Sequence, residues 1–358
     1  MCPFRRILIT GGAGFVGANL CVFLKREFAE IHVVAFDNLK RRGSELNVRR
    51  LKSHGIEFIH GDVRSPEDLA ELPAFDLLID CAAEPSVHAG IADGPAYVVN
   101  TNLLGTFHCL EESRRRNAHF LLLSSSRVYP IRTLNALPYQ ERATRYDWQP
   151  QDTAAGASPD GITEEFSLTG ERSFYGASKL AAELLLQEYT ACYGMPALIN
   201  RCGVLAGPWQ MGRIDQGVVA LWAASHMFQL PLSYRGFEGR GKQVRDVLHI
   251  EDLFDLLVCQ MRAVSAWDGS VFNVGGGRMC STSLVELTDL CRSITGRDLR
   301  LNASPETSTV DLRIYLTNFT KVSRTFGWTP KRDMHRIVSD ITDWLVTHRH
   351  LVEPIFCP

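Results

Sequence analysis

The feature that most restricts the fold of this chain is an alternation between short apolar runs and longer amphipathic stretches. The runs are rich in Ile, Val, Leu and Phe, and the segment after the first one reads GANLCVFLKREFA. Strands that are apolar throughout and alternate with helices are typical of a parallel sheet covered on both faces. We therefore predict an α/β fold with a doubly wound parallel sheet. The runs are RILIT, IHVVAFD, IEFIHGD, LLIDCA, FLLLSSS and PALINR.

The turn after the first run, GGAGFVG, places Gly11, Gly14 and Gly17 in the spacing GxxGxxG. The strand is expected to end at Thr10 and a helix to begin near Phe15. Glycines at this place allow a tight turn and a close approach of the backbone to a pyrophosphate, which the helix N-terminus attracts. Because a strand precedes it and a helix follows it, the motif predicts a dinucleotide site in a Rossmann-like fold. A purely structural turn is the alternative.

Two acidic residues follow the second and third apolar runs. Asp37 comes roughly 20 residues after the last glycine, where a carboxylate binds a ribose 2′-hydroxyl and repels a 2′-phosphate. This favours NAD over NADP, although the basic residues at 40–42 could accept a phosphate. Asp62 could reach the adenine amino group, or it could form an Asx turn. The other residues expected to line the cofactor are Phe15, Val16, Asn38, Val63, Ala82 and Ala83.

The pattern changes in the second half of the chain. Residues 131–172 interrupt the alternation, and the polar stretch QPQDTAAGASPDG within them predicts a long loop. After Arg201 the sequence becomes irregular and rich in Gly and Arg, until VFNVGGG indicates a late strand and turn. We predict a dinucleotide-binding domain at 1–201, with 246–275 returning to it, and a smaller C-terminal α/β substrate subdomain at 202–245 and 276–358.

The stretch SFYGASK places Tyr175 and Lys179 four residues apart, on one face of an expected helix. An ammonium close to a phenol favours the phenolate, which makes the tyrosine usable as a general acid or base. Two ordinary helix-surface residues are the alternative. Upstream, three serines end the run FLLLSSS at the edge of the sheet where ligands of such folds bind. A helix cap is the alternative for a serine there.

Together these motifs resemble the extended short-chain dehydrogenases/reductases, in the group of nucleotide-sugar epimerases and dehydratases. The likeness runs from about residue 5 to about residue 345, and it includes NLLGT from Asn102 and a serine four positions before the tyrosine of VYP. The resemblance implies that Ser125 and Tyr175 are catalytic and that Lys179 holds the nicotinamide ribose. It also implies that Asn102 lines the cofactor cleft.

The resemblance further implies a substrate site. Arg245 in QVRDVLH and Arg313 match the arginines that clamp the diphosphate of a sugar nucleotide, and Ser125 would bond the reacting sugar oxygen. Arginine suits a diphosphate because it donates two parallel hydrogen bonds. A surface ion pair is the alternative, favoured more for Arg313 than for Arg245.

Within the group, four stretches are most similar to the CDP-tyvelose (CDP-paratose) type of 2-epimerase. The implied activity is an NAD-dependent epimerisation that passes through a keto-sugar, with a CDP-sugar favoured over a UDP-sugar as substrate. A UDP-sugar 4-epimerase and a non-catalytic NAD-binding protein are the alternatives. The 4,6-dehydratases of the group carry Asp-Glu after the catalytic threonine, whereas Ser126 and Arg127 stand here and cannot act as a carboxyl pair. The four stretches are FDNLKRRGSELNVRRL, ATRYD, DQGVVALW and GKQVRDVLH.

Composition excludes several other classes of protein. The net charge of -2 offers no electrostatic footprint for nucleic acid or for an anionic membrane. No run approaches the roughly 20 apolar residues of a membrane helix, and we do not expect the start MCPFRRILITGG to act as a signal peptide. The ten cysteines form no CxxC pair and the histidines form no HExxH motif, so we expect no metal site. A reduced, cytoplasmic protein is expected.

The stretch YGASKLAAELLLQEY carries more apolar residues than one sheet face requires, among them Leu180, Leu184 and Tyr189. In resembling proteins this helix pairs across a two-fold axis. We therefore expect a homodimer or a homotetramer built from dimers, with a monomer that has an apolar helix patch as the alternative.

Overall fold

A computed structural model describes residues 2–149, 154–213 and 216–357. The chain divides into two compact units. The first comprises Met1–Val128, Ser173–Arg201 and Phe254–Phe272, and the second comprises Tyr129–Arg172, Cys202–Leu253 and Asn273–Pro358. Residues 129–172 thus belong to the second unit, whereas the sequence analysis kept 1–201 together. The division by role, into cofactor and substrate parts, remains a prediction.

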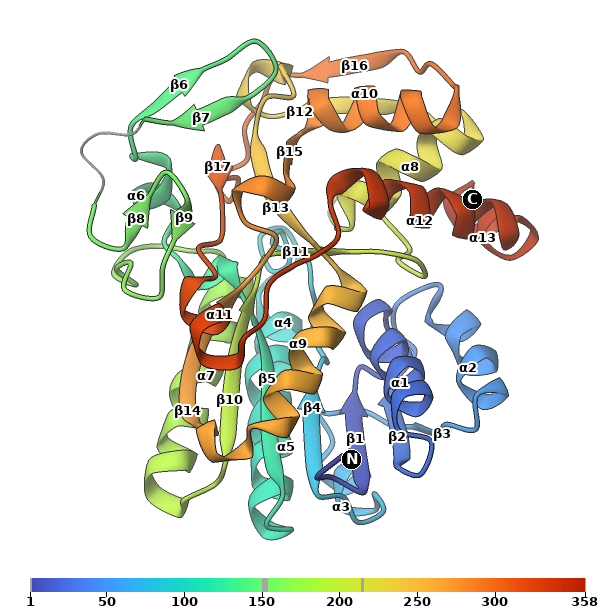
Figure 1. Ribbon diagram of the computed structural model, residues 1–358, viewed down its shortest axis with the longest axis vertical. Coiled ribbons are helices and arrows are strands. Elements are labelled where there is room, and N and C mark those ends of the chain that lie inside the picture. The colour runs from blue at the N-terminus through green and yellow to red at the C-terminus, as the bar shows by residue number, and fades with distance from the viewer. Residues whose placement is uncertain (1, 150–153, 214–215, 358) are drawn as a thin grey trace. The chain divides into compact units, whose positions relative to one another are not determined.

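The first unit is built on a seven-stranded sheet with the strand order β14-β10-β5-β4-β1-β2-β3 (Figure 1). The pairs from β3 to β5 are parallel, and the order reverses at β1, as in a doubly wound sheet. This confirms the predicted fold class. The strands are β1 (Arg6–Thr10), β2 (His32–Asp37), β3 (Glu57–His60), β4 (Leu77–Asp80), β5 (His119–Ser125), β10 (Ala197–Cys202) and β14 (Asp268–Val274).

Helices connect these strands and cover both faces of the sheet. Alternate strand residues such as Leu8, Leu78 and Phe120 share one apolar cluster with Leu110 and Leu186 of two helices. Their neighbours in sequence point to the opposite face, because side chains alternate along a strand. The helices are α1 (Phe15–Glu27), α2 (Ser44–Ser53), α3 (Pro66–Ala70), α4 (Ala96–Val99), the π-helix η1 (Asn100–Leu104), α5 (Gly105–Arg115), the 3-10 helix η2 (Ser126–Val128), α7 (Phe174–Tyr193), α9 (Ile250–Arg262) and the 3-10 helix η4 (Val264–Ala266).

The second unit holds smaller sheets. Strand β13 lies between β11 and β15, and it also pairs with β17. Two hairpins, β6–β7 and β8–β9, come from the segment 131–172. The strands are β6 (Tyr139–Glu141), β7 (Tyr146–Trp148), β8 (Ala157–Ser158), β9 (Gly161–Ile162), β11 (Val204–Ala206), β12 (Leu232–Arg235), β13 (Val244–His249), β15 (Ser281–Ser283), β16 (Leu301–Ser304) and β17 (Ile314–Tyr315).

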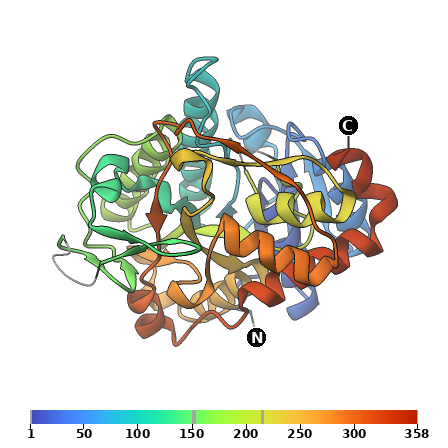
Figure 2. The same cartoon turned by 90° about the horizontal axis from the view of Figure 1, so that it is seen from above.

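Three helices of the second unit, α8, α10 and α12, pack against one another (Figure 2). Helix α10 begins at a capping box, in which Ser283 and Glu286 each bond the other's backbone N–H, and it ends at Gly296 in the left-handed conformation. The helices are α6 (Ile131–Asn135), α8 (Val218–Phe228), the 3-10 helices η3 (Phe237–Gly239) and η5 (Arg278–Cys280), α10 (Leu284–Thr295), α11 (Thr320–Phe326), α12 (Met334–Thr347) and α13 (Arg349–Phe356).

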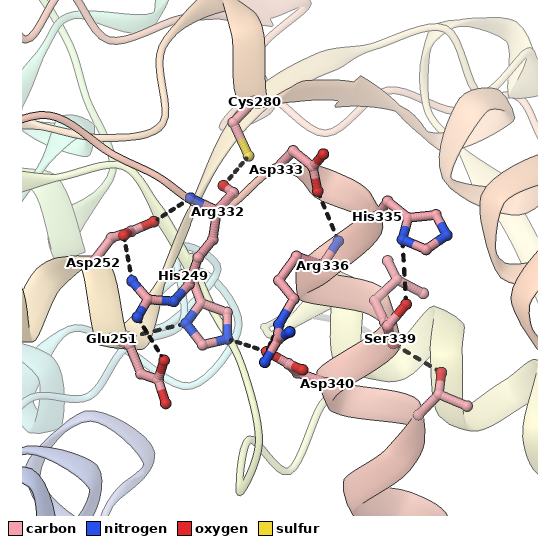
Figure 3. Close-up of polar contacts among 12 residues, drawn as sticks. His249, Glu251, Asp252, Cys280, Arg332, Asp333, His335, Arg336, Ser339 and Asp340 are labelled. Carbon is pink, nitrogen blue, oxygen red and sulfur yellow. Dashed lines mark hydrogen bonds and ion pairs between the residues drawn. The ribbon is translucent and has the colours of Figure 1, made fainter.

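A polar network ties β13 and the start of α9 to the segment that enters α12 (Figure 3). Asp252 is fully buried and receives Nη1 of Arg332 at 2.5 Å and the backbone N–H of the same residue at 3.0 Å. His249 Nε2 lies 3.4 Å from an oxygen of Asp340, which also receives Arg336 Nε at 2.8 Å. The network therefore combines an ion pair to a fully buried carboxylate, Asp252, with a more exposed pair between Arg336 and Asp340.

The segment 131–172 contains more regular structure than the sequence predicts. A long loop was expected, yet the segment forms α6 and two hairpins. Of the polar stretch 149–161, residues 150–153 lie outside the described residues, and 157–158 form strand β8. None of the helices in the described part of the chain combines the length and the hydropathy needed to span a bilayer.

Candidate functional site

The glycine turn of the first unit has no room for side chains. Gly11 adopts a left-handed conformation with φ of 61°, and its carbonyl oxygen accepts the N–H of Gly14 at 2.9 Å. A Cβ atom on Gly17 would lie 2.3 Å from that same oxygen. Helix α1 begins at Phe15 without a side-chain cap, so its first N–H groups face outward from a bare backbone turn. Such a cradle fits a pyrophosphate, which is the group expected here.

Asp37 at the end of β2 lies against this turn. Its Oδ2 accepts the backbone N–H of Ala13 at 3.1 Å, and its Oδ1 accepts that of Leu39 at 2.7 Å. Burial raises the pKa of the Asp37 carboxyl group, and the backbone N–H groups of Leu39, Ala13 and Gly14 oppose that shift. A carboxylate has about four acceptor positions, so Asp37 keeps acceptor capacity for a hydroxyl group of a ribose.

Asp62 makes the turn that the sequence analysis gave as its alternative role. Its Oδ1 accepts the N–H of Arg64 at 2.9 Å, and the guanidinium of Arg64 donates to both carboxylate oxygens, at 3.0 and 2.6 Å. Asn38 donates to Oδ2 at 2.9 Å. The hydrogen bond from Arg64 holds the pKa of Asp62 far below its usual range. A contact of Asp62 with adenine remains a prediction. The next residue, Val63, is buried in the apolar cluster of the first unit.

Asn102 holds the segment after β4 in place. Its Oδ1 accepts the N–H of Glu84 at 2.7 Å, and its Nδ2 donates to the carbonyl oxygen of the same residue at 3.1 Å. Asn102 is fully buried within a π-helix, a geometry that is frequent at functional sites. Both the oxygen and the nitrogen of its side-chain amide are therefore bonded within the protein. Ala82 and Ala83 lie half-buried in the same segment.

The sequence analysis did not predict the hydrogen bonds that hold the end of β4, which leads into that segment. Asp80, which ends β4, is buried and accepts Thr10 Oγ1 at 2.6 Å and Thr106 Oγ1 at 2.7 Å. These three residues fasten the ends of β1 and β4 to helix α5. In the sequence, Asp80 is a single acidic residue at the end of an otherwise apolar strand. That pattern indicates a special role but does not identify the hydrogen-bond partners.

The three catalytic candidates lie on β5 and α7 of the first unit. Ser173 caps α7 by accepting the N–H of Gly176 at 3.2 Å, and the helix carries Tyr175 half-buried and Lys179 2% exposed. Lys179 Nζ donates to the carbonyl oxygen of Leu123 in β5 at 3.1 Å. Ser125 ends that strand, and its Oγ accepts the N–H of Arg127 at 3.1 Å.

A buried ion pair, also missed from the sequence, continues the face of α7 that carries Tyr175 and Lys179. Glu183 is 1% exposed and binds Arg201 of β10, with Nη2 of Arg201 2.7 Å from Oε2. Ser124, the neighbour of Ser125, donates to the other carboxylate oxygen of Glu183. Helix α7 is thus fixed to β5 and β10 one turn beyond Lys179. Glu183 follows Lys179 by four residues, and this spacing could have placed it on the same helix face from the sequence.

The two arginines predicted to bind substrate belong to the second unit. Arg245 on β13 pairs with Asp311, with Nη2 2.9 Å from Oδ1, and also donates to the carbonyl oxygens of Val244 and Leu312. Arg313 precedes β17, and its backbone carbonyl accepts the N–H of Val244 at 2.9 Å. The ion pair offered as an alternative role is therefore present at Arg245, while Arg313 lies against aromatic rings. Their role in substrate binding remains a prediction.

The chain is similar in sequence and in fold to known nucleotide-sugar epimerases and dehydratases. A family model described as "NAD dependent epimerase/dehydratase family" matches residues 7–275. CDP-paratose 2-epimerase of Salmonella typhi is 32% identical over 346 residues, which are 95% of this chain and 98% of that protein. A dTDP-glucose 4,6-dehydratase of Shigella flexneri is 26% identical over 370 residues, covering 98% of this chain and 95% of that protein. The crystal structure of the UDP-glucose 4-epimerase of Thermus thermophilus in complex with NAD has a TM-score of 0.76 at 26% identity, covering 96% of this chain and 99% of that one.

Proposed function

Because the chain belongs to the NAD dependent epimerase/dehydratase family, we propose that it is a nucleotide-sugar epimerase that inverts C2 of a CDP-activated deoxysugar. The family match confirms the resemblance drawn from the motifs, and it confirms NAD as the cofactor. The turn at Gly11–Gly17 would hold the pyrophosphate of NAD, and Asp37 its adenosine ribose. Bound NAD supplies a reversible two-electron oxidation of a sugar carbon.

The observation that carries the proposal is the arrangement of β5 and α7. Tyr175, as a phenolate, would take the proton of the sugar hydroxyl and later return it. Lys179, held by the carbonyl oxygen of Leu123, would place its positive charge beside that phenolate and bond the nicotinamide ribose. Ser125 would donate a hydrogen bond to the reacting oxygen at the end of the strand.

Dehydration is disfavoured by the residues that follow Ser125. Removal of water from a sugar requires an acid and a base in addition to the tyrosine. Ser126 and Arg127 stand at the two positions after Ser125, and neither can perform that proton transfer. CDP-paratose 2-epimerase of Salmonella typhi, which is 32% identical, is an epimerase, and this supports isomerisation.

A UDP-sugar 4-epimerase is the second candidate. It is favoured by the likeness to the Thermus thermophilus enzyme over nearly the whole of both chains. The two candidates share the cofactor and the proposed catalytic residues. They differ in which carbon loses its hydrogen during turnover.

Isotopic substitution of the substrate tests the proposal. With CDP-paratose, deuterium at C2 should slow turnover through a primary kinetic isotope effect, and the inverted product should retain the label at C2 by NMR. Deuterium at C4 should leave the rate unchanged. An isotope effect from C4, or turnover of UDP-glucose in preference to CDP-paratose, would assign the chain to the 4-epimerases. No turnover of either substrate by NAD-loaded protein would contradict both candidates.

A further inference from the structure

The hairpin of β6 and β7 contributes to an aromatic enclosure around Arg313 in the second unit. The guanidinium carbon of Arg313 lies 4.1 Å from the ring centroid of Tyr139, 5.9 Å from that of Tyr146 and 5.4 Å from that of Phe237. The rings themselves meet edge to face, at 5.4 Å between the tyrosines and 6.2 Å between Tyr146 and Phe237. We call these three side chains the aromatic box.

The charge of Arg313 is not neutralised in this box. Within the described ranges, no carboxylate lies within ion-pair distance of its guanidinium, and Nη1 donates to the carbonyl oxygen of Asn135 at 3.0 Å. Arg245 differs, because Asp311 lies 2.9 Å from its Nη2. Aromatic faces attract a cation without cancelling its charge, so Arg313 keeps the capacity to bind an anion through its remaining donors.

The backbone at Phe237 is strained in a way that supports the box. Phe237 and Glu238 have φ of 46° and 62°, in the left-handed region that residues other than glycine rarely adopt. Thr307 helps to hold this conformation, since its Oγ1 accepts the N–H of Phe237 at 2.7 Å. Strain of this kind persists where surrounding contacts impose it, and it is concentrated at ligand clamps and active sites.

The hairpin is held by contacts other than the box. Glu141 lies 3.1 Å from Arg240 Nη1 and 2.7 Å from Lys242 Nζ, which tie β6 to the segment before β13. Asp147 receives Arg278 Nη2 at 2.8 Å. Tyr139 itself is 37% exposed. A substitution at Tyr139 therefore removes one face of the box while the contacts that fix the hairpin remain.

We propose that Tyr139 and Tyr146, supplied by the 131–172 segment, are positioning residues that hold the Arg313 guanidinium for the diphosphate of a nucleoside diphosphate. This inference rests on the proposed function and gives the segment a role in it. The tyrosines act through Arg313, so the loss of an aromatic face should matter only while Arg313 is present.

A double-mutant cycle tests this dependence. The affinity of NAD-loaded protein for CDP and for UDP is measured by titration calorimetry for wild type, Tyr139→Leu, Arg313→Met and the double variant. We expect Tyr139→Leu to weaken binding of the tighter nucleotide by about 3- to 30-fold. Tyr139→Phe should retain most of the affinity, because it keeps the aromatic face. Tyr193→Leu, at an exposed tyrosine of α7, is the matched control.

The cycle separates this inference from its alternatives. In the Arg313→Met background, Tyr139→Leu should weaken binding less than twofold. An equal loss in both backgrounds would show that Tyr139 contacts the ligand itself or supports the fold, and the inference would be wrong. The inference is also overturned if neither CDP nor UDP binds the wild type. Absence of epimerase activity with normal nucleotide binding and coupling would contradict the proposed function alone.

Discussion

Lys179 Nζ on α7 donates a 3.1 Å hydrogen bond to the main-chain carbonyl oxygen of Leu123 on β5. Leu123 lies two residues before Ser125, and Lys179 lies one helical turn after Tyr175. One buried lysine therefore links the two elements that carry the other catalytic candidates. The carbonyl takes one of three ammonium donors, which leaves two for a ribose and a phenolate.

Tyr175→Phe should abolish epimerisation while the fold and the bound NAD persist. Loss of a general acid/base costs about 10²- to 10⁴-fold in rate, whereas Ser125→Ala removes only a hydrogen bond and should cost less. Turnover is measured with CDP-paratose, and NAD content after purification. Tyr193→Phe on the same helix is the control. Wild-type turnover by Tyr175→Phe would rule out the proposed role of this residue.

Asp37→Ala should weaken NAD binding and reduce the preference for NAD over NADP. The carboxylate would otherwise bond the ribose hydroxyls and repel a 2′-phosphate. Asp37→Asn keeps an oxygen acceptor but removes the charge. It should therefore reduce the preference for NAD over NADP more than it weakens the binding of NAD. Both dissociation constants are measured by fluorescence titration of the apo-protein. A wild type that binds NADP more tightly would contradict the assignment.

Leu184→Glu should lower the state of association. Leu184 is 57% exposed on α7, and Leu104 and Phe107 of the adjoining η1 and α5 are 44% and 37% exposed. Tyr189, which was expected on this surface, is buried in the apolar cluster, because it packs with α5 and donates to Glu111. Sedimentation velocity at micromolar concentration should find a dimer or tetramer for wild type. A wild-type monomer would contradict the prediction, and Val346→Glu on α12 is the control.

Asp246→Asn should change how stability depends on pH. Asp246 is fully buried in β13, and burial raises the pKa of its carboxyl group to about 6. The folded protein thus holds this proton more tightly than the unfolded chain, so the stabilisation is complete below the unfolded value of 3.8 and is lost as the pH rises through about 6. The amide can still accept the N–H of Gly277, which donates to Oδ2 at 3.1 Å.

Urea unfolding at about pH 4 and about pH 8 measures this effect. Relative to wild type, Asp246→Asn should gain on the order of 3 kcal/mol in free energy of unfolding between the two conditions. Asp160→Asn, at an exposed position, should gain nothing. Parallel pH profiles for wild type and Asp246→Asn would show that the buried carboxyl group does not titrate in this range.

Arg332→Met should destabilise the second unit far more than Arg336→Met (Figure 3). Arg332, itself 24% exposed, donates to the fully buried carboxylate of Asp252. Removing one partner of a fully buried pair costs about 3–5 kcal/mol, and we expect a loss of up to that size here, because among the described residues only the backbone N–H of residue 332 would still bond the carboxylate. Arg336 is 63% exposed and pairs with Asp340, so its loss should cost about 0–1 kcal/mol. Thermal unfolding compares the two variants, and similar midpoints would contradict the prediction.

Local patterns predicted the sheet of the first unit and the residues expected to do chemistry. The run RILIT became β1, the glycine turn led into α1 at Phe15, and Tyr175 and Lys179 share a helix. Each of these features depends on neighbours within a few residues, whose spacing alone determines the face of a strand or helix. The family model, which matches residues 7–275, adds the identity of the cofactor, NAD.

Tertiary structure alone decided which partners the polar side chains acquire. Asn102 holds the backbone of Glu84, and Arg313 lies in a box that includes Tyr139, at a distance along the chain that carries no periodic signal. Asp62 differs from these residues, because its partner Arg64 is only two residues away and forms the local turn that the sequence already offered as one of its two roles. Buried polar groups must be satisfied by whatever donors and acceptors the packed chain brings near them, and a sequence pattern does not specify those encounters.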